Sequence, residues 1–443
     1  MIEQLSQAVY YINILWDIIK NWWWVFLPFI ITPRFLFFWR WWRMETWMFA
    51  QKKILLEIKM PKEVLKPIRA MEQVFYSLWG NLFDPADWWE HWFEGKCNDT
   101  LQLEIASLGG EPHFYIRCSE PRRNAIESSV YAQYPEAEIS VVEDYTKLVP
   151  NSLPNKDWEL WGTDYRLIKP DVYPILTYSK FFEEKPDTPK EEKRIDPVAN
   201  LLEGMSTFRP GEYLWIQFEI KAISNTKKAT DGEPYYDEGR KIADELAKRP
   251  KKAAPKSILG DAVNEVITGQ LPGVEEKKEL SLESIYPPEL RLTPGEKDIV
   301  TAVENKITKR MFSCYARFIY LAKRDLYLGA AKAIPFGFLH QFAAENLNQL
   351  IPLPRTLTKI KKYPILNLLR VRRLYRKKRR LFFRYINRWD PFFPKPGGRF
   401  LLNAEELATI YHFPGRTSAG APSVSRVESK RGEAPAGLPL EEE

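Results

Sequence analysis

Cysteine is scarce in this chain of 443 residues. Cys97, Cys118 and Cys314 form no CxxC pair and no even-numbered set, so they indicate no disulfide framework. This pattern is typical of thiols that pack as small apolar groups in a reducing compartment.

Histidine is rare as well. None of the four histidines lies in an HExxH motif or at zinc spacing from a cysteine, so the sequence predicts no metal site.

The motifs of nucleotide-dependent and nucleophilic catalysis are also missing. There is no GxxxxGK[ST] loop, no GxGxxG after an expected strand and no Ser/His/Asp arrangement of the nucleophile-elbow type. The acidic stretch 181–192 is interleaved with lysine and proline, which favours a solvated loop over a metal site. We therefore predict a protein that is not an enzyme and has no catalytic, cofactor-binding or metal-binding residues.

Aromatic residues are abundant, and the sixteen tryptophans concentrate in the first hundred residues. Within this part, the segment Val9–Ile31 has the length of a helix that spans a bilayer core of about 30 Å. Asp17 and Lys20 interrupt the apolar run, although their spacing lets them pair on one helix face. A helix that lies in the plane of the headgroups is the alternative. The expected anchor residues are Trp22, Trp23, Trp24, Phe26, Phe29 and Ile30.

Flanking charge predicts the orientation of this segment. No lysine or arginine precedes it, whereas Arg34, Arg40, Arg43, Lys52 and Lys53 follow it. Because positive residues stay on the cytoplasmic side, we expect a single-pass protein of the cell membrane with a cytoplasmic C-terminal part. The basic flank would face anionic lipid of the inner membrane. No small-residue cleavage site follows the run, so we expect no cleaved signal peptide.

Beyond an anchor at residues 1–51, the pattern predicts an α+β protein with two ferredoxin-like modules. Residues 52–150 carry the order β-α-β-β-α-β of that fold. The Gly109-Gly110 pair is typical of a hairpin between its second and third strands. The expected strands are 53–59, 101–107, 113–118 and 137–143, and the expected helices are 65–78 and 121–134.

The same order recurs in residues 151–414, with a large insertion at about 224–310. The expected strands of this second module are 158–168, 213–223, 312–322 and a closing strand at 399–402, and its helices are 197–207 and 328–347. In the insertion we expect helices at 239–247, at 258–268 and from Thr293, whose partner three residues on is Glu296, as in a capping box. Residues 415–443 lack apolar periodicity and are expected to be disordered.

A basic helix expected at 359–388 is the sharpest charge feature. Residues 355–388 contain no acid, and leucine and aromatic residues are interleaved with the lysines and arginines. Three interpretations compete: contact with the anionic inner leaflet, contact with a nucleic-acid phosphate backbone, or a solvated helix that covers the second module. The residues expected to contact lipid or nucleic acid are Arg370, Arg372, Arg373, Arg376, Lys377, Lys378, Arg379, Arg380 and Arg384.

Four segments, 61–75, 109–145, 169–185 and 402–415, resemble a family of membrane proteins from candidate-phyla bacteria. That family is similar to the N-terminal, non-motor half of conjugative-transfer ATPases of the type IV coupling-protein and HerA-like kind. The resemblance runs from about residue 45 to the end, and it is specific for the family rather than for a reaction. In such ATPases, segments like 405–414 and 434–439 come shortly before the nucleotide-binding motor. We therefore expect the motor to be a separate polypeptide, or the gene to be split or truncated.

The resemblance implies a membrane-anchored, non-catalytic adaptor or structural component of a type IV secretion or conjugation-like apparatus. Such a protein would present its cytoplasmic modules to a separate ring ATPase. The alternative is a membrane-tethered nucleic-acid-binding module that uses the basic helix 359–388. The expected partners are the inner membrane, a P-loop ATPase, DNA and further copies of this chain, and no cofactor is expected.

Overall fold

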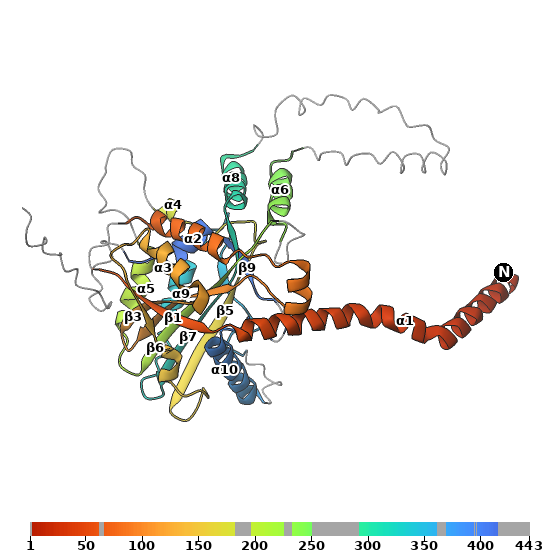
Figure 1. The fold of residues 1–443 in the computed structure, drawn as a ribbon, viewed down its shortest axis with the longest axis horizontal. Coiled ribbons are helices and arrows are strands. Elements are labelled where there is room, and N and C mark those ends of the chain that lie inside the picture. Colours follow the sequence, from red (N-terminus) through yellow and green to blue (C-terminus); the bar gives the residue numbers. More distant parts are fainter. Residues whose placement is uncertain are drawn as a thin grey trace, which may run out of the picture.

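The computed structural model describes residues 2–61, 66–181, 196–225, 233–249, 292–360, 369–393, 395 and 397–414. Within these residues a single antiparallel sheet of nine strands has the order β4-β1-β3-β2-β6-β7-β5-β8, and β9 pairs with β7 (Figure 1). The class is therefore α+β. The expected N-terminal transmembrane helix is wrong, because no described helix has the length and apolar character of a membrane span. The two halves of the chain share one sheet.

The first half of the sheet comes from residues 53–142. Its strands lie in the order β4-β1-β3-β2, which is the order of a ferredoxin-like unit. Gly109 and Gly110 form the turn between β2 and β3 with φ of 67° and 102°, a conformation that a side chain would disfavour. The elements are β1 (Lys53–Lys59), α2 (Ile68–Leu82), η1 (Glu90–Glu94), β2 (Thr100–Leu108), β3 (Glu111–Ser119), α3 (Arg123–Tyr131) and β4 (Glu138–Val142).

The second half closes with a strand that differs from the expected one. β8 pairs with β5, whereas the expected closing segment 399–402 forms β9 (Phe400–Asn403) and pairs with the start of β7. The helix expected at 328–347 is also shorter in the structure, where its helical part is α9. The elements are β5 (Trp158–Leu167), α5 (Pro197–Ser206), β6 (Glu212–Ala222), β7 (Met311–Lys323), α9 (Ala333–His340), β8 (Leu350–Pro352) and, after β9, α11 (Ala404–Ile410).

Two helices of the insertion, α6 (Tyr235–Leu246) and α8 (Pro294–Thr308), lie side by side (Figure 1). α8 begins with the expected capping box: the Thr293 hydroxyl accepts from the Glu296 amide at 3.3 Å, and the Glu296 carboxylate accepts from the Thr293 amide at 2.8 Å. The helix expected at 258–268, residues 361–368 of the expected basic helix and the tail lie outside the described residues. Lys359 and Ile360, where the basic helix was expected to begin, are not helical.

The two halves meet at the pairing of β2 with β6, which we call the seam. Nine residue pairs form it, from Thr100↔Lys221 to Leu108↔Tyr213. Each of these strands is an edge of its own ferredoxin-like unit, so their pairing removes two exposed edges at once. The seam therefore makes one continuous sheet from two units.

The sheet has two faces of different character. On the first face, side chains such as Leu103, Ile216 and Phe318 join a core with α2, α3, α5, α9 and α11. On the second face, Trp215 and Ile319 pack against helix α10 (Arg370–Asn387). The strands also place many polar side chains on the second face, and these residues build the sites described below.

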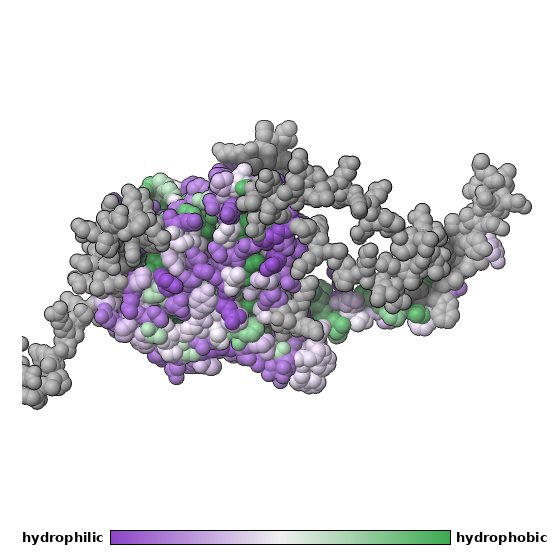
Figure 2. All heavy atoms as spheres, turned by 90° about the horizontal axis from the view of Figure 1, so that it is seen from above, coloured by the Kyte–Doolittle hydropathy of each residue, from purple (hydrophilic) through white to green (hydrophobic). Residues whose placement is uncertain are grey.

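Helix α1 (Ile2–Ala50) projects from the body as an arm (Figures 1 and 2). Its last turns are held by η1 and by the segment after α10. Trp39 Nε1 donates to the Trp92 carbonyl at 2.9 Å, and Arg43 Nε donates to the Phe93 carbonyl at 2.5 Å. Phe49 also meets Trp389 edge-on, with ring centroids 6.1 Å apart. The C-terminal end of α1 is therefore part of the folded body.

In the described part of the chain, no helix combines the length and the apolar character that a membrane span requires. The predicted single-pass anchor is therefore wrong, and so is the predicted placement in the cell membrane with a cytoplasmic C-terminal part. The sequence contains the reason. Between Asn21 and Thr32 the uninterrupted apolar run is ten residues long. Such a run gives about 15 Å of helix, about half of what a bilayer core needs.

The residues expected to form the anchor lie on the projecting part of α1. Trp24, Phe29 and Ile30 are exposed there, at 58%, 76% and 68% of their full surface. The side chains of Trp22, Trp23 and Phe26 lie outside the described residues. The arm thus exposes an apolar surface.

Ile216 tests whether the two halves fold as one body. It is fully buried on the first face, opposite Ile105 across the seam. We expect Ile216→Ala to lower the free energy of unfolding by about 2–4 kcal/mol, because it removes buried methyl groups and leaves a cavity. Urea unfolding, followed by fluorescence and far-UV circular dichroism, should remain one transition. The control Val371→Ala, at a side chain 82% exposed, should change stability by less than about 0.5 kcal/mol. Two resolved transitions would contradict the single sheet.

Candidate functional site

Helix α10 lies on the second face of the sheet and is amphipathic. Leu381, Phe382 and Tyr385 are buried in the core of that face. Lys378 is buried on the same side, and its Nζ donates to the Glu159 carboxylate at 2.7 Å. Because these residues recur at helical spacing, they occupy one side of α10, and the other side faces away from the sheet.

The outward side of α10 carries five exposed arginines, which we call the arginine face: Arg372, Arg373, Arg376, Arg379 and Arg380. Their spacing of one, three, three and one residues keeps them within one broad stripe of the helix. Among the described residues, none of the five has a carboxylate within ion-pair distance. The face is therefore a concentration of positive charge without internal compensation.

The other four residues of the predicted contact set point toward the body. Lys378 holds Glu159, as described above. Lys377 Nζ donates to the Leu357 carbonyl at 3.2 Å, and burial together with Arg373 lowers the pKa of Lys377. Arg384 donates to the Pro391 carbonyl, and burial lowers its pKa to about 10. Arg370 is half-buried. The structure thus divides the predicted set into an outward and an inward group.

A buried ion cluster holds the end of α10 to the seam. Arg388 follows α10 and donates to both carboxylate oxygens of Glu104, at 3.1 and 3.2 Å. Glu104 also accepts from the Tyr145 hydroxyl and from Gln217 Nε2, each at 2.7 Å. Glu104 and Gln217 lie opposite each other in the β2–β6 pair. Burial alone would lower the pKa of Arg388, but Glu104 and Asp144 hold this pKa well above its ordinary value.

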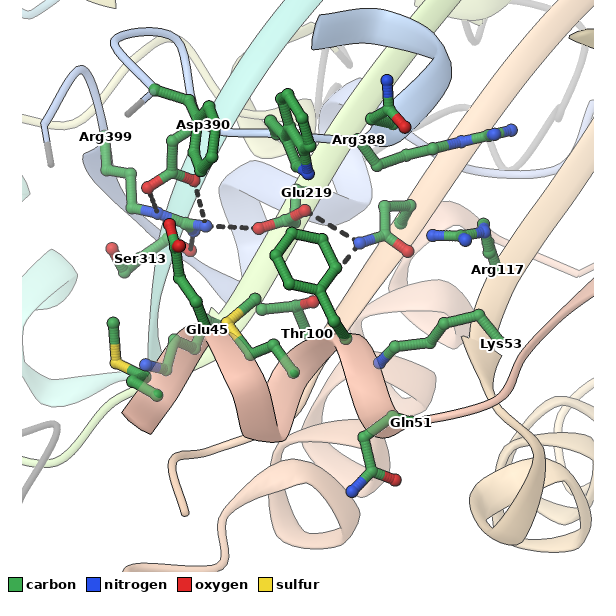
Figure 3. A pocket seen from close by; sticks show the side chains of 18 of the residues that line it. Glu45, Gln51, Lys53, Thr100, Arg117, Glu219, Ser313, Arg388, Asp390 and Arg399 are labelled. Atoms are coloured by element: carbon green, nitrogen blue, oxygen red, sulfur yellow. Dashed lines mark hydrogen bonds and ion pairs between the residues drawn. The ribbon is translucent and has the colours of Figure 1, made fainter. Parts of the chain in front are cut away.

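A cleft of about 500 Å³ opens beside this cluster, and we call it the α1 cleft (Figure 3). The last turns of α1 form its roof, the second face of β2, β3, β6 and β7 forms its floor, and the segment after α10 forms a wall. The roof includes Met44, Glu45, Met48 and Phe49. Because α1 and the segment after α10 are both needed to enclose it, the cleft depends on contacts between distant parts of the chain.

The floor of the cleft carries a row of polar side chains. Arg117, Gln102 and Glu219 lie directly across from one another on β3, β2 and β6. Gln102 Nε2 donates to Glu219 at 2.8 Å. Arg399 donates to Glu219 and to Asp390, the latter at 2.7 Å, so one guanidinium joins both carboxylates (Figure 3). The acids of the floor and wall are therefore already paired.

Two polar groups of the floor have no partner among the described residues. Arg117 is half-buried and makes no hydrogen bond or ion pair there, and burial together with the charge of Arg388 lowers its pKa. The Oε1 atom of Gln102 is buried and accepts no hydrogen bond. On the roof, burial raises the pKa of Glu45. The cleft thus offers a free cation and a free acceptor next to each other.

The sequence prediction did not include the residues of the cleft. They did leave a signal, because polar and apolar residues alternate along the strands at Gln102 and Glu104, at Arg117, and at Gln217 and Glu219. Such alternation usually indicates a sheet face in contact with water. Here α10 and the end of α1 cover that face instead, so the polar residues are buried.

No family model matches this chain, and no curated protein matches it significantly. In the part of the chain that the structure describes, no three His, Cys, Asp or Glu side chains come together to hold a metal ion. Cys97, Cys118 and Cys314 are buried, and burial raises the pKa of Cys118 to about 12. The arginine face and the α1 cleft are the two candidate sites.

Arg388 tests the cluster that holds α10 in place. Arg388→Gln would leave the fully buried Glu104 without its cation. We therefore expect it to lower the free energy of unfolding by about 3–5 kcal/mol. Arg379→Gln makes the same change on the arginine face and should cost less than about 0.5 kcal/mol. Guanidinium unfolding of both variants measures the difference. Equal stabilities of the two variants would show that the cluster does not hold the helix.

Proposed function

We propose that this chain is a non-catalytic, nucleic-acid-binding adaptor whose arginine face contacts the phosphate backbone. The observation that carries the proposal is the set of five exposed arginines on one side of α10, none of which has a carboxylate partner within the described part of the chain. From Arg372 to Arg380 the helix rises about 12 Å. The same length of duplex DNA carries about seven backbone charges. The face therefore suits a regular polyanion in both length and charge, and release of counterions would drive binding.

The burial of the apolar side of α10 favours a phosphate backbone over a lipid surface. A basic helix that binds a bilayer usually inserts its apolar side between headgroups and acyl chains. In α10, Leu381, Phe382 and Tyr385 are at most 1% exposed because they pack on the sheet. A bilayer would meet the arginines with only the scattered apolar side chains Val371, Tyr375 and Phe383, because the continuous apolar side is buried. A planar guanidinium, by contrast, can hold a phosphate through two parallel hydrogen bonds.

The proposal predicts a salt-dependent affinity that falls with each arginine removed. If all five arginines contact phosphate, the logarithm of the binding constant should fall with the logarithm of salt concentration with a slope of about −4.5. Arg372→Gln/Arg376→Gln/Arg379→Gln should make this slope shallower by about 2.7 and weaken binding at every salt concentration. Fluorescence anisotropy with a labelled duplex of about 20 base pairs, titrated in a salt series, measures both quantities.

The control for this titration is Arg240→Gln/Lys241→Gln, which removes two exposed charges from α6. It should leave slope and affinity unchanged. Vesicles with and without phosphatidylserine provide a second arm. Tight binding to anionic vesicles together with no binding to DNA would contradict the proposal, as would a triple variant that binds DNA like the unmodified protein.

A second candidate function is that of an adaptor for another protein, and the exposed surface of α1 supports it. Apolar side chains follow the arm (Figure 2). Trp88 and Trp89, next to η1, are exposed at 68% and 58%. Contiguous exposed apolar surface often marks a place where another molecule binds. The resemblance to the non-motor half of conjugative-transfer ATPases makes a separate ring ATPase of a type IV secretion or conjugation-like apparatus the proposed partner. The adaptor would act by raising the local concentration of nucleic acid at that motor.

The partner proposal predicts what a nuclease-treated pulldown of the tagged full-length protein recovers. We expect a P-loop ATPase with the unmodified protein and with the arginine triple variant. We expect loss of the ATPase with Phe29→Ser/Ile30→Ser, which makes the arm polar. Mass spectrometry identifies the recovered proteins. Recovery of no ATPase with the unmodified protein would contradict the adaptor proposal and leave nucleic-acid binding standing.

A further inference from the structure

We propose that the α1 cleft binds a small carboxylate or phosphate that carries a hydroxyl or N–H group beside its charge and an apolar ring behind it. This site is separate from the arginine face, and the proposal does not depend on nucleic-acid binding. A volume of about 500 Å³ lies within the usual range for small-molecule sites. The cleft also combines apolar walls with a few polar groups at one end, as such sites do.

The pattern of ion pairs selects an anion as the ligand. Lys53 is held by Asp99 at 2.5 Å, Arg388 is held by Glu104, and Arg399 is held by Asp390. Arg117, by contrast, has no partner among the described residues and reaches the cleft from β3. A half-buried guanidinium loses part of its hydration, and for Arg117 the attraction of Glu104, Asp144 and Glu219 does not offset burial and the repulsion of Arg388, so its pKa stays lowered. A ligand carboxylate or phosphate would supply the missing charge through hydrogen bonds that match the guanidinium fork.

The neighbour of Arg117 specifies the group beside that charge. Gln102 lies directly opposite Arg117 in the strand pair, and it is 2% exposed. Its Nε2 is used by Glu219, but its Oε1 accepts no hydrogen bond within the described residues. Because Oε1 can only accept, the ligand needs a hydroxyl or N–H donor close to its anionic group. A simple anion would pair with Arg117 and leave Gln102 unsatisfied.

Aromatic side chains line the part of the cleft that would hold the ring. Phe49 of the α1 roof meets Trp389, and Trp389 stacks on Phe393 with centroids 4.0 Å apart. Figure 3 shows Glu45 on the side of Arg399, and Arg117 with Lys53 on the opposite side. The anionic group would therefore lie away from the roof carboxylate of Glu45, with the ring between α1 and the wall.

Mandelate, phenylacetate and 1-phenylethane-1,2-diol test this inference with the full-length protein. Mandelate has the ring, the carboxylate and an adjacent hydroxyl; phenylacetate lacks the hydroxyl, and the diol lacks the charge. We expect mandelate to bind at least about tenfold more tightly than the diol and several-fold more tightly than phenylacetate. Tryptophan fluorescence reports binding, because Trp389 lines the cleft, and isothermal titration calorimetry gives the stoichiometry of one.

Arg117→Gln should weaken mandelate binding at least about tenfold without changing binding of the diol. Arg372→Gln, on the arginine face, is the matched control and should bind mandelate like the unmodified protein. Circular dichroism confirms that both variants are folded. Mandelate that binds the unmodified protein no better than the diol would overturn the inference, whether or not Arg117→Gln folds. Equal mandelate affinity of Arg117→Gln and the unmodified protein would overturn it as well.

Discussion

The rest of the structure depends on the pairing of β2 with β6. Each strand would be an open edge if its ferredoxin-like unit stood alone, and an open edge invites pairing with another chain. The nine residue pairs of the seam close both edges and place the two helical layers on the same side. The opposite side becomes one surface, broad enough for α10 and the end of α1 to lie on it together. Both candidate sites lie on or above that surface.

On the second face, buried charged side chains determine how α10 is oriented on the sheet. Glu104 and Glu219 lie on the two strands of the seam and are 0% and 2% exposed. A buried carboxylate is costly unless a cation and hydrogen bonds compensate it, and Arg388 and Arg399 come from the segment that follows α10. These ion pairs, with the apolar side of α10, fix which side of the helix faces the sheet. The arginines of the other side are left for a partner that lies outside the chain.

Local patterns in the sequence predicted individual elements well. The first strand was expected at 53–59, where it lies, and 213–223 and 312–322 fall within about a residue of β6 and β7, because alternation is a local property. The seam has no such signal, since its partners are about a hundred residues apart and every amphipathic strand fits many neighbours. β8 has three residues, too few to show a period, so 399–402 was taken as the closing strand in its place. In both cases tertiary contacts decided the outcome.

The candidate sites were predictable in part. Composition alone revealed the basic helix, but whether Lys378 points inward and Arg379 outward depends on how α10 docks. The cleft was not predicted because the alternation at Gln102 and Arg117 is typical of a strand with one solvated face, whereas α1 and residues near 390 cover that face. The aromatic N-terminal segment predicted a membrane span, although Asp17, Lys20 and Asn21 leave too short an apolar run. When elements that are distant in the sequence cover a polar sheet face, no local sequence pattern reveals it.

Native-state hydrogen exchange of the seam amides shows whether the two halves form one body. The opening free energies of β2 and β6 amides are compared with those of β3 and β7, the strands within each half. We expect equal values that approach the free energy of global unfolding, because the seam opens only when the whole sheet unfolds. Seam amides that exchange through an opening of distinctly lower free energy, with β3 and β7 still protected, would show that the halves separate and would contradict a single body.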